Sequence, residues 1–148
     1  MKQLLSLITL VFLALGAGSA NAEGDPPLDI RNAGDVTLVE FLWLNRLIVV
    51  FADSELDPAF QKQLALLQDR AADLTERDVV VIADFDPASP SDIRNTLRPR
   101  GFNFVLIDKD GVVKLRKATP WDTREISRSI DKTDLRQQEL RDARAGGS

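Results

Sequence analysis

The sequence predicts an α/β fold built on a four-stranded mixed sheet with helices on both faces. Two apolar runs, Leu47–Phe51 and Val79–Ala83, flank a helical pattern. Continuous apolar runs are typical of strands that are covered on both faces. A strand, a helix and a strand of these lengths predict a βαβ unit with parallel strands.

The predicted first helix begins at a strong start signal. Asp57 offers a capping carboxylate, and Pro58 suits the first helical position. Apolar residues then recur at spacings of four and three, as on one face of an amphipathic helix. This apolar stripe consists of Phe60, Leu64, Leu67, Ala71 and Leu74.

The remaining elements complete the order βαβ-α-ββα. Ser89-Pro90 opens a short helix, Phe102–Ile107 reads as a third strand, and the turn sequence DKDG leads into a fourth, Val112–Arg116. Asp122 begins a last helix, with Ile126 and Ile130 one turn apart. Short connections place these elements in the thioredoxin-like arrangement.

The predicted domain spans residues 41–140. Lys2, the apolar run 4–15 and the small residues ending at Ala22 predict a secretory signal peptide over 1–22, cleaved after Ala22. An uncleaved membrane anchor is the alternative, but the run is shorter than the roughly 20 residues that a spanning helix needs. We therefore expect a periplasmic or secreted protein with no membrane anchor after cleavage.

The segments on either side of the domain read as mobile. Residues 23–34 hold two prolines and little apolar content, so a flexible leader is predicted over 23–40. The charged segment 135–144 continues the chain as a tail for which a helix is one alternative, and 141–148 are predicted to be disordered. Residues 36–44 are rich in apolar side chains but fit neither the helical nor the strand period, which leaves a short helix or an edge segment open.

Composition excludes several kinds of chemistry. The chain has no cysteine and no histidine, so thiolate catalysis, thiolate metal sites and imidazole acid–base chemistry are absent. Residues 23–93 hold 5 basic and 15 acidic residues, whereas residues 94–148 hold 13 basic and 8 acidic residues. The halves attract one another within one fold, or the second half presents a basic face to an acidic partner. We expect no nucleic-acid partner, because the chain is net acidic and is predicted to be exported.

Four segments together resemble a bacterial family of domains of unknown function, the DUDES type, with related modules in extracellular sushi-repeat proteins. They are NRLIVVFA, ERDVVVIAD, FVLIDKDGVVKLR and PWDTREISRSID, and the resemblance runs from about Phe41 to Leu140. It implies a thioredoxin-like or peroxiredoxin-like fold, secretion and no settled activity. The cysteines of redox-active members of that fold would fall around 53–57, and their cis-proline near Phe102, where the nearest proline is Pro99.

Acidic residues gather at the predicted strand ends: Asp53, Asp57, Asp84 and Asp86. They cap helices and turns, or they form an oxygen-ligand site for calcium or magnesium. Asp108 and Asp110 belong to turn chemistry. No metal ligand set and no cofactor are predicted.

Arginines and aromatics supply the other candidates. Arg98 and Arg100 flank Pro99 beside Phe102, and are either solvated charges or a binding site for an anion or a partner carboxylate. Trp121 packs over the sheet edge or recognises a partner.

We therefore expect a non-catalytic module that binds a periplasmic or extracellular protein. The alternative is a carboxylate-based, divalent-metal-dependent enzyme.

Overall fold

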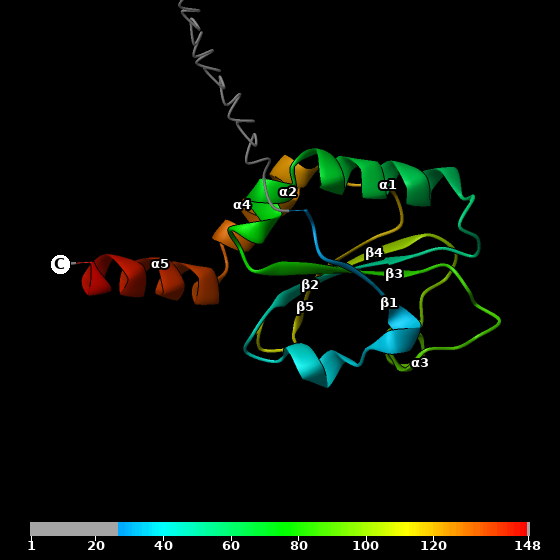
Figure 1. Cartoon of the computed structure of the whole chain (residues 1–148), viewed down its shortest axis with the longest axis horizontal. Coiled ribbons are helices and arrows are strands. Elements are labelled where there is room, and N and C mark those ends of the chain that lie inside the picture. Colours follow the sequence, from blue (N-terminus) through cyan, green and yellow to red (C-terminus); the bar gives the residue numbers. More distant parts are fainter. Residues whose placement is uncertain (1–26, 148) are drawn as a thin grey trace, which may run out of the picture.

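The computed structural model describes residues 27–147, and the predicted signal peptide lies outside them. The chain folds around one mixed sheet of five strands in the order β1-β3-β2-β4-β5 (Figure 1). The strands are β1 Ile30–Asn32, β2 Arg46–Phe51, β3 Val79–Asp84, β4 Asn103–Ile107 and β5 Val113–Lys117. The predicted α/β class is confirmed, with one strand more than expected.

Strand direction follows from the connections. The β2–α1–β3 crossover makes β2 and β3 parallel neighbours, with Ile48 opposite Val81. The hairpin β4–β5 runs antiparallel, and β4 pairs antiparallel with β2, so that Val49 lies opposite Val105. Every residue of β2, β3 and β4 is buried, as the apolar runs predict.

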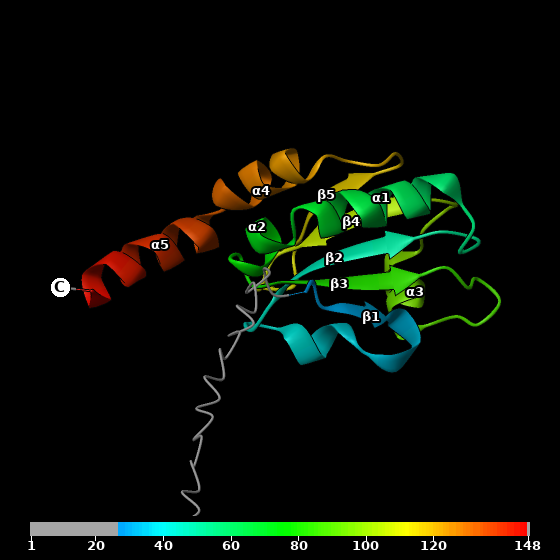
Figure 2. The same cartoon turned by 45° about the horizontal axis from the view of Figure 1, so that its top comes forward.

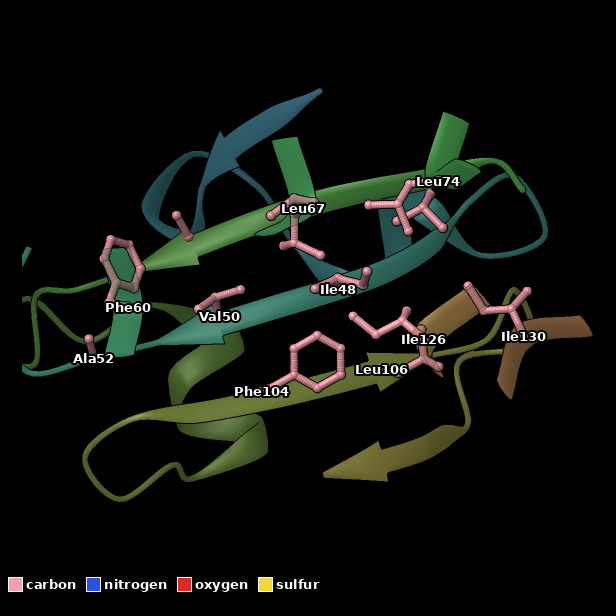
Figure 3. Close-up of a cluster of buried hydrophobic side chains, with 13 residues drawn as sticks. Ile48, Val50, Ala52, Phe60, Leu67, Leu74, Phe104, Leu106, Ile126 and Ile130 are labelled. Carbon is pink, nitrogen blue, oxygen red and sulfur yellow. The ribbon is translucent and has the colours of Figure 1, made fainter. Parts of the chain in front are cut away.

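Helices cover both faces of the sheet. On one face lie α1 Pro58–Asp69, α2 Ala71–Thr75 and α4 Thr123–Asp131; on the other lie the 3₁₀ helices η1 Ala33–Asp35 and η2 Leu38–Phe41 together with α3 Asp92–Leu97 (Figures 1 and 2). The first face packs Phe60, Leu67, Leu74, Ile126 and Ile130 onto the strands (Figure 3). Among residues 27–147, no helix is long and apolar enough to cross a membrane.

The first helix is shorter than its apolar stripe predicts. Asp57 caps α1 as expected, accepting hydrogen bonds from the backbone N–H groups of Ala59 and Phe60. The helix ends at Asp69, because Arg70 leaves the helical region at φ −130° and ψ 43°, and α2 carries Leu74 to the core. The stripe is therefore divided between two helices.

The prediction of a flexible leader over 23–40 is wrong for its described part. β1 pairs in parallel with the free edge of β3, and Ala33, Val36 and Phe41 are buried under the sheet. A strand of three largely polar residues is too short for a periodic signal, and β3 supplies its hydrogen-bond partners. The ambiguous segment 36–44 contains η2, a 3₁₀ helix, so the helical alternative is the correct one.

The predicted disordered tail, 141–148, is also wrong, because α5 Asp134–Gly146 continues through most of it. Thr133 caps this helix by accepting a hydrogen bond from the Arg136 N–H. Arg136 is buried, and Glu139 reaches the first residue of β2. These long-range charge contacts attach α5 to the domain, although the helix projects past the sheet (Figure 2).

Candidate binding surfaces

Most of the predicted site residues lie at one end of the sheet. Phe51, the last residue of β2, lies opposite both Asp84 at the end of β3 and Asn103 at the start of β4. The segments 53–57 and 98–102, which adjoin these residues, therefore lie at the same end. Ligands of open α/β sheets bind at the carboxyl ends of the parallel strands.

Asp84 is buried and fully engaged with Arg94 of α3. The Arg94 Nη2 atom lies 2.8 Å from Asp84 Oδ1, and Ser91 Oγ donates to Asp84 Oδ2 over 3.0 Å. The same Nη2 donates to the carbonyl of Ala52 at 3.0 Å, and the guanidinium lies 5.4 Å from the ring centre of Phe51. Arg94 thus occupies the strand ends where the sequence leaves an oxygen-ligand site as one of two alternatives.

The other three carboxylates have separate roles. Asp57 caps α1, Asp86 accepts a hydrogen bond from the Ala88 N–H in the loop after β3, and Asp53 is exposed. Within residues 27–147, no three acidic side chains come close enough together to hold a metal ion. The helix-capping and turn interpretation of these residues agrees with the contacts of Asp57 and Asp86.

Arg98, Arg100 and Phe102 lie together in the connection between α3 and β4. Arg98 ends α3 in the left-handed conformation at φ 48°, and Gly101 follows at φ 57°. Both arginines are exposed, whereas Phe102 is half-buried against the core. The two guanidinium groups therefore project from a loop that Phe102 holds on the sheet.

Trp121 packs over the sheet, as the structural alternative predicts. Its ring meets Phe104 edge-on at 6.2 Å between centres, and Lys117 Nζ lies 5.1 Å from its ring centre. Gln63 fixes its backbone, accepting from the Trp121 N–H at 2.7 Å and donating to the Trp121 carbonyl at 3.0 Å. These contacts make Trp121 a packing residue.

A second surface, at the opposite end of the sheet, was missed from sequence. An apolar pocket of about 230 Å³ opens between η2 and the β4–β5 turn, with Leu47 and Ile107 among its lining residues. Large apolar side chains stand exposed at or near its mouth: Val39, Leu42, Trp43, Leu44 and Val112. We call these five residues the Trp43 surface. The apolar residues of 36–44, which fit neither the helical nor the strand period, were its signal in the sequence.

Buried charges lie beside this pocket. Arg46, the first residue of β2, is 1% exposed, and its Nε lies 3.0 Å from Asp108 Oδ1 in an electrostatic contact without hydrogen-bond alignment. Glu139 of α5 accepts from Arg46 Nη2 at 3.1 Å and meets Lys109 Nζ at 2.8 Å. Lys109 also pairs with Asp78 at 2.8 Å. Each of these charges has a partner of opposite sign.

The pKa of Glu139 reflects its two cationic partners. Burial acts to raise this pKa, but the hydrogen bonds from Lys109 and Arg46 outweigh it and lower the pKa to about 2. Glu139 therefore contributes stability while it is ionised, and α5 stays attached through it.

The chain is similar to known proteins over most of its length. A family model described as "Domain of unknown function (DUF4174)" matches residues 37–139. A coiled-coil domain-containing protein 80 from Danio rerio is 30% identical over 146 residues, covering 78% of this chain but only 16% of the fish protein. The chain thus spans a small part of that relative.

Solved structures similar to the chain are thioredoxins and peroxiredoxins. The 2-Cys peroxiredoxin of Plasmodium vivax has a TM-score of 0.56 at 16% identity, covering 71% of this chain and 85% of its own. Chloroplastic thioredoxin z has a TM-score of 0.55 at 22% identity, and the match covers 73% of this chain and 97% of thioredoxin z. A thioredoxin from Thermus thermophilus has a TM-score of 0.50 at 19% identity, and the match covers 72% of this chain and 87% of the thioredoxin. At these identities the likeness shows a thioredoxin-like fold alone.

Replacing Arg94 by alanine should destabilise the protein by about 3–5 kcal/mol, because Asp84 would remain buried without its cation. Asn95→Ala, at an exposed position of the same helix, should change stability by under about 0.5 kcal/mol. Chemical denaturation measures both. Equal midpoints for the two variants would contradict the assigned role of the pair.

Glu139→Gln should lower the melting temperature at pH 7 and have little effect near pH 2. The folded-state pKa of Glu139 lies below its ordinary value of 4.5, so its stabilisation is present above pH 4.5 and is lost as pH falls toward 2. Melting curves across this range measure the difference between variant and parent. A difference that stays constant with pH would refute the assignment.

Proposed function

Because the chain belongs to the family described as domain of unknown function DUF4174, we propose its function from its own geometry: a non-catalytic, exported thioredoxin-like module that binds a protein partner. The observation that carries the proposal is the set of side chains at the ends of β2 and β3. A thioredoxin-like fold is kept without any cysteine, and Arg94 joins Asp84 and the Ala52 carbonyl there.

Thiol oxidoreductase and peroxidase activities require a thiolate, which this chain cannot form. An alternative acid–base mechanism needs a carboxyl group that can reach a substrate within a closed site. Asp84 is instead paired with a guanidinium, and Asp53 is exposed. The arrangement at this end therefore favours binding over chemistry, and a carboxylate-based metalloenzyme is the weaker proposal.

Arg98, Arg100 and Phe102 are the contacts that we assign to the partner. Two exposed arginines beside an aromatic ring suit a carboxylate-bearing surface, because guanidinium groups form paired hydrogen bonds with carboxylates. Arginine and aromatic residues are also enriched among the residues that dominate interface energies. Chloroplastic thioredoxin z, whose structure is described as defining "a novel type-specific target recognition", is a precedent for binding by this fold.

Export is the second part of the proposal. It rests on Lys2, the apolar run 4–15 and the small residues before Glu23. The relation to extracellular sushi-repeat modules remains a prediction of the sequence resemblance. An exported location would make the partner a periplasmic or extracellular protein.

Replacing Arg98 and Arg100 together by glutamate should abolish capture of the dominant partner in crosslinking within the exporting compartment. Both side chains are exposed, so the melting temperature should stay nearly unchanged. A matched control is Lys62→Glu with Arg124→Glu, which makes the same change in charge at two other exposed positions. Equal capture by the two double variants would place the binding surface elsewhere.

The mature protein should begin at Glu23. Intact-mass spectrometry of the chain recovered from the exporting host measures this directly, and Ala20→Leu with Ala22→Leu should block processing by removing the small residues that the cleavage site requires. Recovery of the native chain with residues 1–22 still attached would remove the support for export.

A further inference from the structure

We propose that the Trp43 surface joins two copies of this chain in a two-fold symmetric dimer. The surface holds both a projecting aromatic side chain and a pocket. The Trp43 side chain is 65% exposed, and Leu42 and Val39 line the pocket beside it. Nothing in this inference depends on whether Arg98 and Arg100 bind a different partner at the other end of the sheet.

The backbone holds Trp43 outward. Its φ of 63° lies in the left-handed region, which is unfavourable for a bulky aromatic residue. The Trp43 N–H donates to the Lys109 carbonyl at 2.7 Å, and the N–H groups of Leu44 and Asn45 both donate to the Phe41 carbonyl at 3.0 Å. The segment is thus fixed by η2 and by the β4–β5 turn, which set the direction in which the Trp43 Cα–Cβ bond leaves the backbone.

The turn that forms the other wall is equally fixed. Gly111 has a φ of 81°, and a Cβ added there would lie 2.9 Å from Leu42 Cδ2. The turn therefore approaches η2 as closely as a glycine allows. The pocket and its exposed rim form a preformed surface, which needs little ordering on association.

Charge favours a second copy as the occupant. The full chain carries a net charge of −4, so two copies repel wherever uncompensated charges meet. Here the charged lining residues are already neutralised: Asp108 lies against Arg46, and Lys109 pairs with Asp78 and Glu139. Glu40 of η2 is exposed; it accepts a hydrogen bond from the Thr37 hydroxyl at 2.9 Å, and its charge interacts with the Arg31 guanidinium. Two identical acidic molecules can approach here, whereas an oppositely charged partner would gain more at a charged face.

Symmetry lets one contact use both features of the surface. In a two-fold interface, residue i of one copy contacts residue j of the other, and j contacts i. A projecting Trp43 next to a pocket then allows each copy to place its indole against the pocket of the other. Isolated apolar residues are ordinary on protein surfaces, but an apolar pocket with two exposed apolar lining residues, Val39 and Leu42, and three more in the adjoining segments is typical of an interaction site. The Trp43 surface consists of five residues, against roughly 20–30 per partner in a standard interface, so we expect a weak, concentration-dependent dimer.

Sedimentation velocity of the purified chain, from low micromolar to millimolar concentration, should show conversion of monomer to dimer. Trp43→Asn removes the indole and keeps a residue that tolerates the left-handed backbone. The substitution should raise the dissociation constant of the dimer by about tenfold or more. Leu56→Asn is the matched control, because Leu56 is 77% exposed at the opposite end of the sheet and should leave the constant unchanged.

Disulfide trapping gives an independent readout. The parent chain has no cysteine, so a single introduced cysteine can link only two copies of itself. Leu44→Cys should form a covalent dimer on mild oxidation, and Leu56→Cys should not. A monomer at every concentration or equal trapping at positions 44 and 56 would overturn the proposal. In the exporting host, disulfide linkage of the Leu44→Cys variant only to a different protein would overturn it as well.

Discussion

The pairing of Arg94 with Asp84 is the interaction on which the carboxyl end of the sheet depends. Asp84 closes the buried strand β3, and an isolated carboxylate there would carry a large desolvation cost. Arg94 offsets this cost and also binds the Ala52 carbonyl, so one side chain connects α3 to the ends of β2 and β3. The position of α3 in turn sets the loop with Arg98 and Arg100. The proposed partner surface is therefore held by a charge pair beneath it.

The opposite end of the sheet follows the same principle. Arg46 begins β2 as a buried cation, and it is compensated by Asp108 from the β4–β5 turn and by Glu139 from α5. This compensation attaches the C-terminal helix and leaves the neighbouring pocket without free charge. Both ends of the sheet thus carry a buried guanidinium, and a different surface lies beside each: basic at one end and apolar at the other.

Local patterns in the sequence predict the buried strands, the cap at Asp57 and the helix α4, because apolar runs and capping residues act over a few positions. β1 escapes such analysis because its three residues gain order only by pairing with β3. The charge pairs escape because Arg94 and Asp84 are ten residues apart and Arg46 and Glu139 are 93 apart. Arg46 directly before an apolar strand was the visible clue, since a buried charge there requires a partner.

The candidate acidic site illustrates the same limit. Strand order correctly predicts that Asp53, Asp57, Asp84 and Asp86 belong to one end of the sheet, yet it cannot show that a helix cap and an arginine engage two of them. The apolar segment 36–44 fits neither period because its side chains are divided between the core, which contains Val36 and Phe41, and the exposed Trp43 surface.

Hydrogen exchange of the chain, with and without its captured partner, tests the central claim most directly. The claim is that the strand-end region of this fold binds a protein instead of performing chemistry. We expect slower backbone exchange in residues 98–102 and 53–57 when the partner is bound, with β2 and β3 unchanged. Protection that omits both loops, or a partner that is released chemically altered, would contradict the claim.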